Sequence, residues 1–350
     1  MEELRIAVVG LGMGMNRAKI VHDTPGARLV AVADLIPARR DKAAEQFGCR
    51  AHESFDELMA HADDVEVVYV MSESGRHADM GMAAARAGKH VISTKPIDIT
   101  VDKAIEFCRV CEECGVRLLV DFQMRYTEAV QKMRAAVQQG ALGKPLFGEV
   151  RMKWWRGEDY YEGWHGTWEL DGGGSIMNQA VHFIDILQYC LGDVDEVYAY
   201  SGVHAHVNCE TEDMTNALLK FANGAEGMIH TQTNFRGKNY DLVEINGTQG
   251  AVAVTLNDLS RWEFVPPEGR DEKWEAQGGY TKPTQGAAYE PALSLPETPA
   301  SAVDDAIRTI RGGATPFCDG WQAIRSIAVG LACYESARSG QPVKPRMDYR

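Results

Sequence analysis

Residues 4–34 read LRIAVVGLGMGMNRAKIVHDTPGARLVAVAD. An apolar run up to Val9 is followed by a glycine-rich turn, a helix-like stretch and a second apolar run that ends in Asp34. Gly10 permits a sharp turn after the first strand, and Gly12 lets the backbone approach a pyrophosphate that faces the free N–H groups of the helix. An acid about 20 residues further on accepts hydrogen bonds from an adenosine ribose. Strand, turn, helix, strand and acid in this order predict a dinucleotide-binding unit.

The glycine pattern of this turn departs from GxGxxG at its third position, where Met15 stands. We expect Gly14, one residue earlier, to provide the close contact between helix and strand. Gly10, Gly12, Met13 and Gly14 are therefore our candidate cofactor residues. The alternative is an ordinary strand–helix–strand unit that holds no nucleotide.

The composition limits the possible partners of the chain. With 350 residues it should form two domains, each large enough for its own core. The net charge of −14 disfavours nucleic acid and anionic membranes, although local donors can still bind a small phosphorylated ligand. No apolar run approaches the roughly 20 residues of a membrane span. The eight cysteines show no secreted-scaffold pattern and the first strand begins at Leu4, so we expect a cytoplasmic protein without a signal peptide.

The first third of the chain alternates between buried strands and helices. Strands are predicted at 65–71, 90–93 and 117–121, and helices at 37–47, 55–62, 76–87 and 101–114. Thr100 is a suitable N-cap, and Gly115 ends its helix at the expected place. This alternation predicts an α/β fold with a doubly wound parallel sheet, which we assign to residues 1–122.

Strands dominate the second part, residues 123–350, in which we predict a mostly antiparallel sheet open on one face. The expected strands are 146–155, 196–206, 215–221, 225–233, 241–246 and 251–256. The expected helices are 126–139, 177–191, 300–311 and 319–339, of which the last is placed to pack back on the first domain. Turns are predicted at 223–224 and 247–250, and a loop or flap at 266–298.

Two stretches carry candidate chemistry. Lys95, in Ser-Thr-Lys-Pro, ends the fifth strand, at the edge where open α/β sheets bind ligands; alone it is equally consistent with a surface lysine in a turn. Residues 172–185 read GGGSIMNQAVHFID and place Asn178, His182 and Asp185 on one helix face. A histidine beside a carboxylate is a tunable acid or base, so we expect Asp185 to hold the tautomer of His182. A structural histidine is the alternative.

With these landmarks the sequence resembles the Gfo/Idh/MocA oxidoreductases, named for glucose–fructose oxidoreductase and inositol dehydrogenase. The resemblance covers nearly the whole chain. It rests on the GxG turn, the stretches 87–91, 140–144 and 172–192, Glu212-Asp213, the turn 246–250 and the closing helix with 334–336.

The resemblance implies a Rossmann domain followed by an α/β domain with a large open sheet. Family members often self-associate through that sheet, so a homodimer or homotetramer is expected. Lys95 corresponds to the active-site lysine of the family and His182 to its acid/base histidine. Two positions depart from the pattern: Asn178 replaces a common aspartate, and Thr94 replaces a common glutamate.

These parts predict a dehydrogenase. A secondary alcohol gives hydride to nicotinamide while His182 takes the hydroxyl proton, Lys95 stabilises the developing alkoxide and Asn178 positions the hydroxyl or the lysine. Asp34 favours NAD because its charge would repel a 2′-phosphate, whereas Arg39 and Arg40 are placed to accommodate NADP. The remaining candidate cofactor residues are Ser72, Glu73, His77, Lys95, Pro96 and Gln123.

The predicted substrate side is rich in aromatic rings and donors, which suit a sugar, a sugar nucleotide or a cyclitol. For Trp154 and Trp168, a core of tryptophans under a loop is the alternative. The candidate substrate residues are Arg125, Arg156, Tyr160, Trp168, Asn178, Asp185, Asn234 and Arg236.

Two metal-like patterns are discounted. Cys108, Cys111 and Cys114 fall inside a predicted helix and turn around its axis, without a fourth ligand nearby in sequence. His204 and His206 lie at a predicted strand end, where a structural or substrate role is preferred. We therefore predict no metal.

Two other functions stay open. One is a glycosidase or lyase that uses retained NAD as a transient oxidant, and this enzyme would not accumulate NADH. The other is a non-catalytic NAD-binding regulator, against which the presence of Lys95 and His182 argues.

Overall fold

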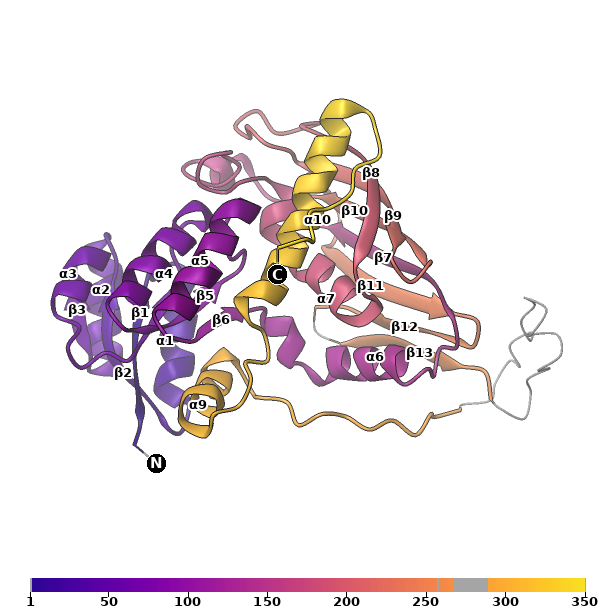
Figure 1. Ribbon diagram of the computed structural model, residues 1–350. Coiled ribbons are helices and arrows are strands. Elements are labelled where there is room, and N and C mark those ends of the chain that lie inside the picture. Colours follow the sequence, from indigo (N-terminus) through magenta and orange to yellow (C-terminus); the bar gives the residue numbers. More distant parts are fainter. Residues whose placement is uncertain (1, 257, 267–288, 350) are drawn as a thin grey trace.

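The structure, a computed structural model, describes residues 2–256, 258–266 and 289–349. These residues form two sheets, each with helices packed against it, joined by the closing helix of the chain (Figure 1). Most of the predicted loop 266–298, namely 267–288, lies outside the described residues.

The first sheet is parallel and six-stranded, with the order β3-β2-β1-β4-β5-β6. This is the doubly wound arrangement in which ligands bind at the carboxyl edge, where the strand order reverses between β1 and β4. Its strands are β1 (Leu4–Val9), β2 (Ala27–Ala33), β3 (Arg50–His52), β4 (Val67–Val70), β5 (His90–Thr94) and β6 (Leu118–Asp121). Its helices are α1 (Gly14–Asp23), α2 (Pro37–Phe47), α3 (Phe55–Ala60), α4 (His77–Arg86) and α5 (Val101–Glu113).

Local sequence explains these boundaries. Proline begins α2 at its first position, where no N–H partner is needed, and Gly48 ends it in the left-handed region at φ 65°. The predicted cap of α5 is confirmed, because the Thr100 side chain accepts a hydrogen bond from the N–H of Lys103. Strand β3 was missed, since three residues are too few to show an apolar period.

The second sheet has seven strands in the order β13-β12-β11-β7-β10-β9-β8. Among the described strands of this second sheet, only β7 and β10 pair in parallel, so the predicted mostly antiparallel sheet is confirmed. The strands are β7 (Pro145–Lys153), β8 (Val194–Gly202), β9 (Met214–Phe221), β10 (Glu226–Gln232), β11 (Tyr240–Gly247), β12 (Gly250–Val254) and β13 (Leu259–Phe264). Its helices are α6 (Glu128–Gln138), α7 (Val181–Leu191) and α10 (Gly320–Ser339), whereas α9 (Ala302–Gly312) packs its buried side chains against the first sheet.

Two predictions need correction here. Strand β8 ends at Gly202, so His204 and His206 lie in the following loop and not on a strand face. The predicted helix 177–191 is divided: one π-helical turn covers Ser175–Gln179, and α7 starts at Val181. Strand β13 was not predicted.

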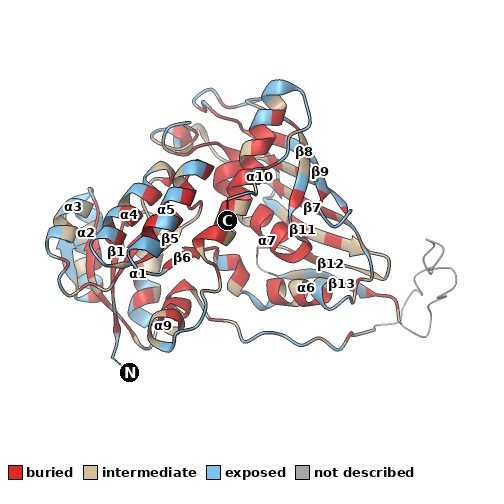
Figure 2. Cartoon of the chain, in the orientation of Figure 1, coloured by how far each residue is buried: buried red, intermediate tan, exposed pale blue. Residues whose placement is uncertain are grey.

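Helices α7 and α10 cover one face of the second sheet, and no helix among the described residues covers the other face, which we call the open face (Figure 2). Residues along β9 alternate between buried and exposed, as expected for a sheet with one covered face. Tyr200 and Leu218 are the large side chains most exposed on the open face, at 68% and 64%.

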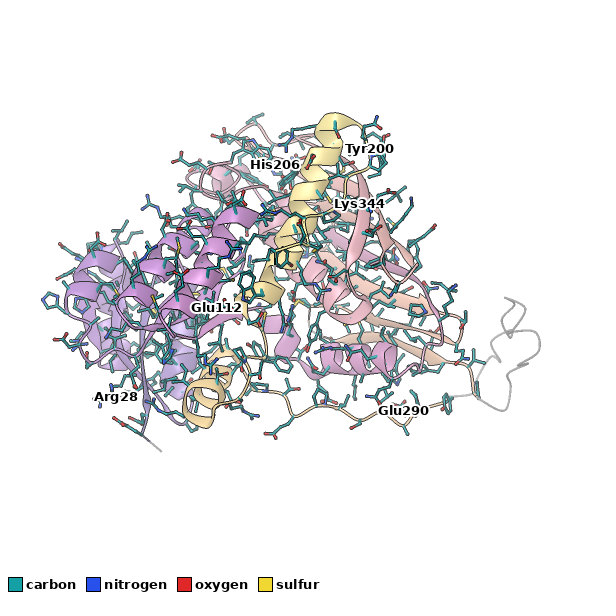
Figure 3. All side chains as sticks on the ribbon, in the orientation of Figure 1. Arg28, Glu112, Tyr200, His206, Glu290 and Lys344 are labelled. Carbon is teal, nitrogen blue, oxygen red and sulfur yellow. The ribbon has the colours of Figure 1, made fainter. Side chains whose placement is uncertain are left out.

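Helix α10 also packs on α5 of the first sheet, as predicted for the last helix. Its Trp321 donates an indole hydrogen bond of 2.7 Å to Glu112, which Figure 3 places beside the start of α10. Apolar side chains from both halves join in one buried cluster. None of the helices among the described residues is long and apolar enough to cross a membrane.

Candidate active site

The glycine-rich turn lies at the carboxyl end of β1. Gly10 has φ 86°, and a Cβ there would stand 2.6 Å from the carbonyl oxygen of Met71. A Cβ at Gly14 would lie 3.0 Å from the Met71 Cβ, which supports the expectation that Gly14 gives the close helix–strand contact. No side chain caps the start of α1, so its first N–H groups remain available to an anion. A Cβ at Gly12 would have only the Arg39 side chain within 4 Å, at 3.7 Å, and Met13 is 76% exposed.

Asp34 closes β2 directly against this turn. One carboxylate oxygen accepts a hydrogen bond of 2.6 Å from the Leu11 N–H, and the other accepts one of 2.8 Å from the Ile36 N–H. The Arg39 guanidinium stands 3.9 Å from the first oxygen, and Arg40 donates to the Asp34 carbonyl at 3.3 Å. The acid and the two arginines are therefore brought together, as the sequence predicted from their spacing.

The stretch after β4 contains Ser72, Glu73 and His77. Ser72 and Glu73 are partly exposed at the sheet edge. His77 is only 1% exposed, and its ring nitrogens contact the carbonyl oxygens of Pro96 at 2.7 Å and Ser72 at 2.9 Å. The ring of His77 is therefore enclosed and joins two segments of backbone, so the structure does not present it at the sheet edge as the sequence prediction assumed.

Lys95 follows β5 and reaches the second half of the molecule. Its Nζ donates a hydrogen bond of 2.6 Å to the carbonyl oxygen of Asn178 and lies 3.5 Å from the Oδ1 of that residue. Burial lowers the pKa of Lys95 to about 8; Asp171 opposes this shift, and the positive charges of Arg17 and Arg156 add to it. The Lys95–Pro96 peptide bond is cis.

His182 lies one turn after Asn178, at the start of α7. Burial, followed by the charges of Lys95 and Arg17, lowers its pKa well below the usual value. The ring is therefore neutral at neutral pH. Its Nδ1 is buried and has no hydrogen-bond partner among the described residues.

Asp185 does not orient His182, which corrects the sequence prediction. Its two carboxylate oxygens accept hydrogen bonds of 2.6 and 2.7 Å from Arg125, and each of the two side chains is 3% exposed. Arg125 also donates to Gln322 of α10 at 2.6 Å. Because the two side chains satisfy each other in the core, neither is free to contact a substrate, contrary to expectation.

Sequence reasoning missed Asp171, which precedes the three glycines. Its side chain is 1% exposed. The carboxylate accepts a hydrogen bond of 2.6 Å from the Asn178 Nδ2 and one of 2.9 Å from the Gly166 N–H. The Nδ1 of His165 lies 3.1 Å from the Asn178 Nδ2 and 3.6 Å from Asp171. Apart from its place directly before the three glycines, the sequence carried no signal for this residue.

Glu212 is a second buried acid that was seen only as a family landmark. Its carboxylate accepts from the N–H groups of Gly174 and Ile176, both at 2.8 Å, and from the Tyr334 hydroxyl at 2.8 Å. Burial raises the pKa of Glu212 to about 7. This carboxylate fixes the entry to the turn that carries Asn178.

An aromatic wall stands next to this cluster. The rings of Tyr160 and His165 stack with centroids 4.1 Å apart, and the Tyr160 hydroxyl accepts 2.8 Å from Gln179. The Arg156 guanidinium lies 5.2 Å from the centroids of Trp154 and Tyr160. These residues offer apolar faces and donors together, which a sugar ring requires.

The other candidate substrate residues lie around this wall. Trp168 is 43% exposed and packs edge-on against Tyr334. Asn234 pairs with Trp155 in an isolated antiparallel β-bridge. The guanidinium carbon of Arg236 lies 4.6 Å from the centroid of the Trp155 ring. The neighbouring loop is held by His206, labelled in Figure 3, whose Nε2 contacts the Arg156 carbonyl oxygen at 2.8 Å.

Arg17 and Asp121 form an ion pair at the same edge of the first sheet. Arg17 donates a hydrogen bond of 2.7 Å to the Asp121 carboxylate, which also accepts one of 2.5 Å from the Tyr69 hydroxyl. Arg17 also donates a hydrogen bond to the Gln123 side chain. These residues line a cavity of about 220 Å³. Gln123 also lines this cavity and is exposed, at the sheet edge where a cofactor residue was predicted.

The three cysteines that were discounted as a metal site lie along α5, with Cys114 as the C-cap of this helix. Cys108 and Cys111 are buried and Cys114 is exposed. In the part of the chain that the structure describes, no three His, Cys, Asp or Glu side chains are placed to hold a metal ion.

The geometry described so far defines a class: a two-part oxidoreductase with an NAD-binding Rossmann fold. Residues 4–122 match the oxidoreductase family with an NAD-binding Rossmann fold, and residues 130–253 match the GFO/IDH/MocA C-terminal domain. The chain belongs to the Gfo/Idh/MocA oxidoreductase family and is an NAD-dependent oxidoreductase.

Among its relatives is inositol 2-dehydrogenase of Rubrobacter xylanophilus, 29% identical over 98% of this chain and 93% of the relative. The 1,5-anhydro-D-fructose reductase of Ensifer adhaerens is 30% identical over 82% of each chain. The WlbA dehydrogenase of Bordetella pertussis, solved with NADH and UDP-GlcNAcA, superposes with a TM-score of 0.84 at 29% identity, over 99% of this chain and 100% of the other.

Proposed function

We propose that the protein oxidises a secondary alcohol of a sugar, sugar nucleotide or cyclitol, with Lys95 and His182 acting on one hydroxyl. The observation that carries the proposal is the 2.6 Å hydrogen bond from Lys95, at the end of a Rossmann strand, to Asn178 in the second part of the molecule. It brings the lysine within one helical turn of His182, at the edge where nicotinamide binds in such sheets.

The residues of the first sheet fit the cofactor. The turn has no room for a Cβ at Gly10, and no side chain caps the start of α1. Asp34 lies against this turn, where its carboxylate would bind the hydroxyl groups of the adenosine ribose. When bound, NAD supplies the acceptor for the hydride. We infer that NAD is preferred over NADP because Asp34 presents a negative charge there, partly offset by Arg39.

The chain's own residues handle the proton. Neutral His182 takes the hydroxyl proton through its ring, while the Lys95 ammonium donates to the same oxygen and stabilises the charge that develops on it. Asn178 holds the ammonium in place through its carbonyl oxygen. Arg156 and Tyr160 provide the contacts on the substrate side.

Relatives support carbohydrate substrates without fixing one for this chain. The names of those compared include an inositol dehydrogenase, an anhydrofructose reductase and a dehydrogenase bound to UDP-GlcNAcA. We further infer that residues 1–122 and 123–350 are the two domains, that the protein works in the cytoplasm, and that copies associate as a dimer or tetramer through the open sheet face.

The test is a panel of sugars, cyclitols, sugar acids and UDP-sugars with NAD, followed by absorbance of NADH. Stoichiometric NADH release with one group of compounds supports the proposal. Turnover without NADH accumulation would instead favour a redox-cycling hydrolase or lyase. NAD binding without turnover of any compound would favour a regulator.

A further inference from the structure

Asp171 is a buried carboxylate whose charge needs an explanation. Among the described residues, no lysine or arginine stands within ion-pair distance of it; its only such neighbour is His165, at 3.6 Å. Burying an unpaired carboxylate is costly unless nearby donors and charges compensate it. The Gly166 N–H and the Asn178 amide supply two hydrogen bonds, and the missing positive charge has to come from the surroundings.

Lys95 supplies that charge, through Asn178. The side-chain amide of Asn178 donates to Asp171 with its Nδ2, and its Oδ1 lies 3.5 Å from the Lys95 Nζ. The main-chain carbonyl oxygen of Asn178 accepts the shorter hydrogen bond from Lys95, at 2.6 Å. Asp171 is the strongest negative influence on the lysine: its charge raises the Lys95 pKa against the lowering by burial. Acid, amide and ammonium therefore form a continuous chain from the loop after β7 to the end of β5.

We propose that Asp171 is a positioning residue for Lys95: through Asn178 it holds the lysine ammonium in place and provides its counter-charge. The proposal rests on the proposed role of Lys95 in the reaction. The same carboxylate orients His165, whose Nδ1 lies beside the Asn178 amide and whose ring stacks on Tyr160. Asp171 thus sets both the lysine and one wall of the substrate space.

The other charges around Lys95 do not take this role. Asp121 is bound to Arg17 and Tyr69. Arg17 and Arg156 are positive and act in the opposite direction, and the neighbouring His182 is neutral. Asp171 is therefore the carboxylate whose removal should affect the lysine most.

The first experiment is the pH profile of kcat/KM for Asp171→Asn. Losing the counter-charge should move the alkaline limb to lower pH by about one unit. Loosening the lysine should reduce kcat by about 100-fold. The dissociation constant of NAD, followed by fluorescence, should not change. Asp171→Glu keeps the charge and should restore the limb position, though not the full rate. A limb that stays in place in Asp171→Asn would overturn the proposal.

Asp305→Asn is the matched control. Asp305 is also 1% exposed and also accepts backbone hydrogen bonds, from Phe317, but it does not contact the Lys95 cluster. The Asp305→Asn variant should have a lower melting temperature, but the alkaline limb of its kcat/KM profile should stay at the same pH. If Asp171→Asn does not fold, Asp171→Ser removes the same charge and should move the alkaline limb of the profile in the same direction, and an unmoved limb in that variant would equally overturn the proposal.

A second readout separates this proposal from the proposed function. Competitive acetylation of lysine amines at a series of pH values, quantified on the Lys95 peptide by mass spectrometry, titrates the lysine without substrate. The midpoint should fall by about one pH unit in Asp171→Asn and remain unchanged in Asp305→Asn. A shifted midpoint in a protein that turns over no carbohydrate would retain the positioning role and refute only the proposed function. An unshifted midpoint would refute the positioning role.

Discussion

Lys95 is the residue whose ionisation most directly controls the proposed reaction. Its folded pKa of about 8 lies below the usual value because it is buried, so the ammonium is present below pH 8 and is lost above it. We expect kcat/KM to decline as the pH rises above about 8, since only the charged form stabilises an alkoxide. A pH profile with the best substrate of the panel measures this limb. An activity still rising at pH 10 would contradict the assignment.

Asp34 decides the choice of cofactor in our account. Replacement by alanine removes the charge that repels a 2′-phosphate and leaves Arg39 without its carboxylate partner, while Arg40 keeps its bond to the main-chain carbonyl of residue 34. We therefore expect Asp34→Ala to weaken NAD binding more than NADP binding. Titrations with both cofactors measure the ratio of the two dissociation constants, and an unchanged ratio would refute the idea.

Single residues were predictable where a motif fixes them and unpredictable where a partner comes from far along the chain. Lys95 and Asn178 were named from sequence, and the structure brings them into contact. Asp185 was given the wrong partner, because helical spacing shows which face a residue shares but not that Arg125, 60 residues away, packs there. Asp171 carries no periodic or motif signal of its own.

At the scale of elements, the turn that begins at Ser175 depends on the absence of a side chain at its entry. A Cβ on Gly174 would lie 1.8 Å from the carbonyl oxygen of Glu212. Gly174→Ala should therefore shift this turn, destabilise the fold by about 1–3 kcal/mol and lower kcat through displacement of Asn178. Thermal unfolding and steady-state kinetics measure the two effects.

Gly312→Ala is the control for this element. A Cβ there would meet nothing within 4 Å, so stability and kcat should stay near those of the unchanged protein. Equal kcat in Gly174→Ala and Gly312→Ala would show that the entry turn does not position the site.

Elements with strong periods were predicted well, and their irregular ends were not. The apolar strands of the first sheet and helices α5 and α10 lie where the pattern placed them. The π-helical turn before α7 was read as regular helix, because its widened backbone depends on the Glu212 carboxylate that binds its N–H groups. Strand β13 was missed because its residues follow no clear alternation of burial.

At the scale of the whole molecule, the open face of the second sheet leaves large apolar side chains in water. Leu218 at 64% exposure lies on β9, next to the strand that carries Tyr200. If copies associate there, Leu218→Lys should split the assembly while preserving the fold, because buried lysines without partners are costly. Light scattering measures the mass of each protein. A monomeric unchanged protein would refute the association.

At the scale of the whole molecule, the sequence predicted that one proposed catalytic residue, Lys95, comes from the Rossmann sheet and the other, His182, from the second part of the chain. Their meeting was an inference from edge positions, and the contact of Lys95 with Asn178 now gives it a geometry. The substrate was not predictable, because neither the sequence nor the stacking of Tyr160 on His165 specifies one sugar or cyclitol.

The most direct test of this account is kcat for Lys95→Ala, His182→Ala and the double variant, on one substrate with saturating NAD. We predict that each single change lowers kcat by about 1,000-fold or more, and that the double variant is little slower than the slower single one, because the two groups serve one transition state. NAD affinity should be nearly unchanged in His182→Ala. A near-normal kcat for His182→Ala, or losses that multiply in the double variant, would contradict the claim that both residues act on one hydroxyl.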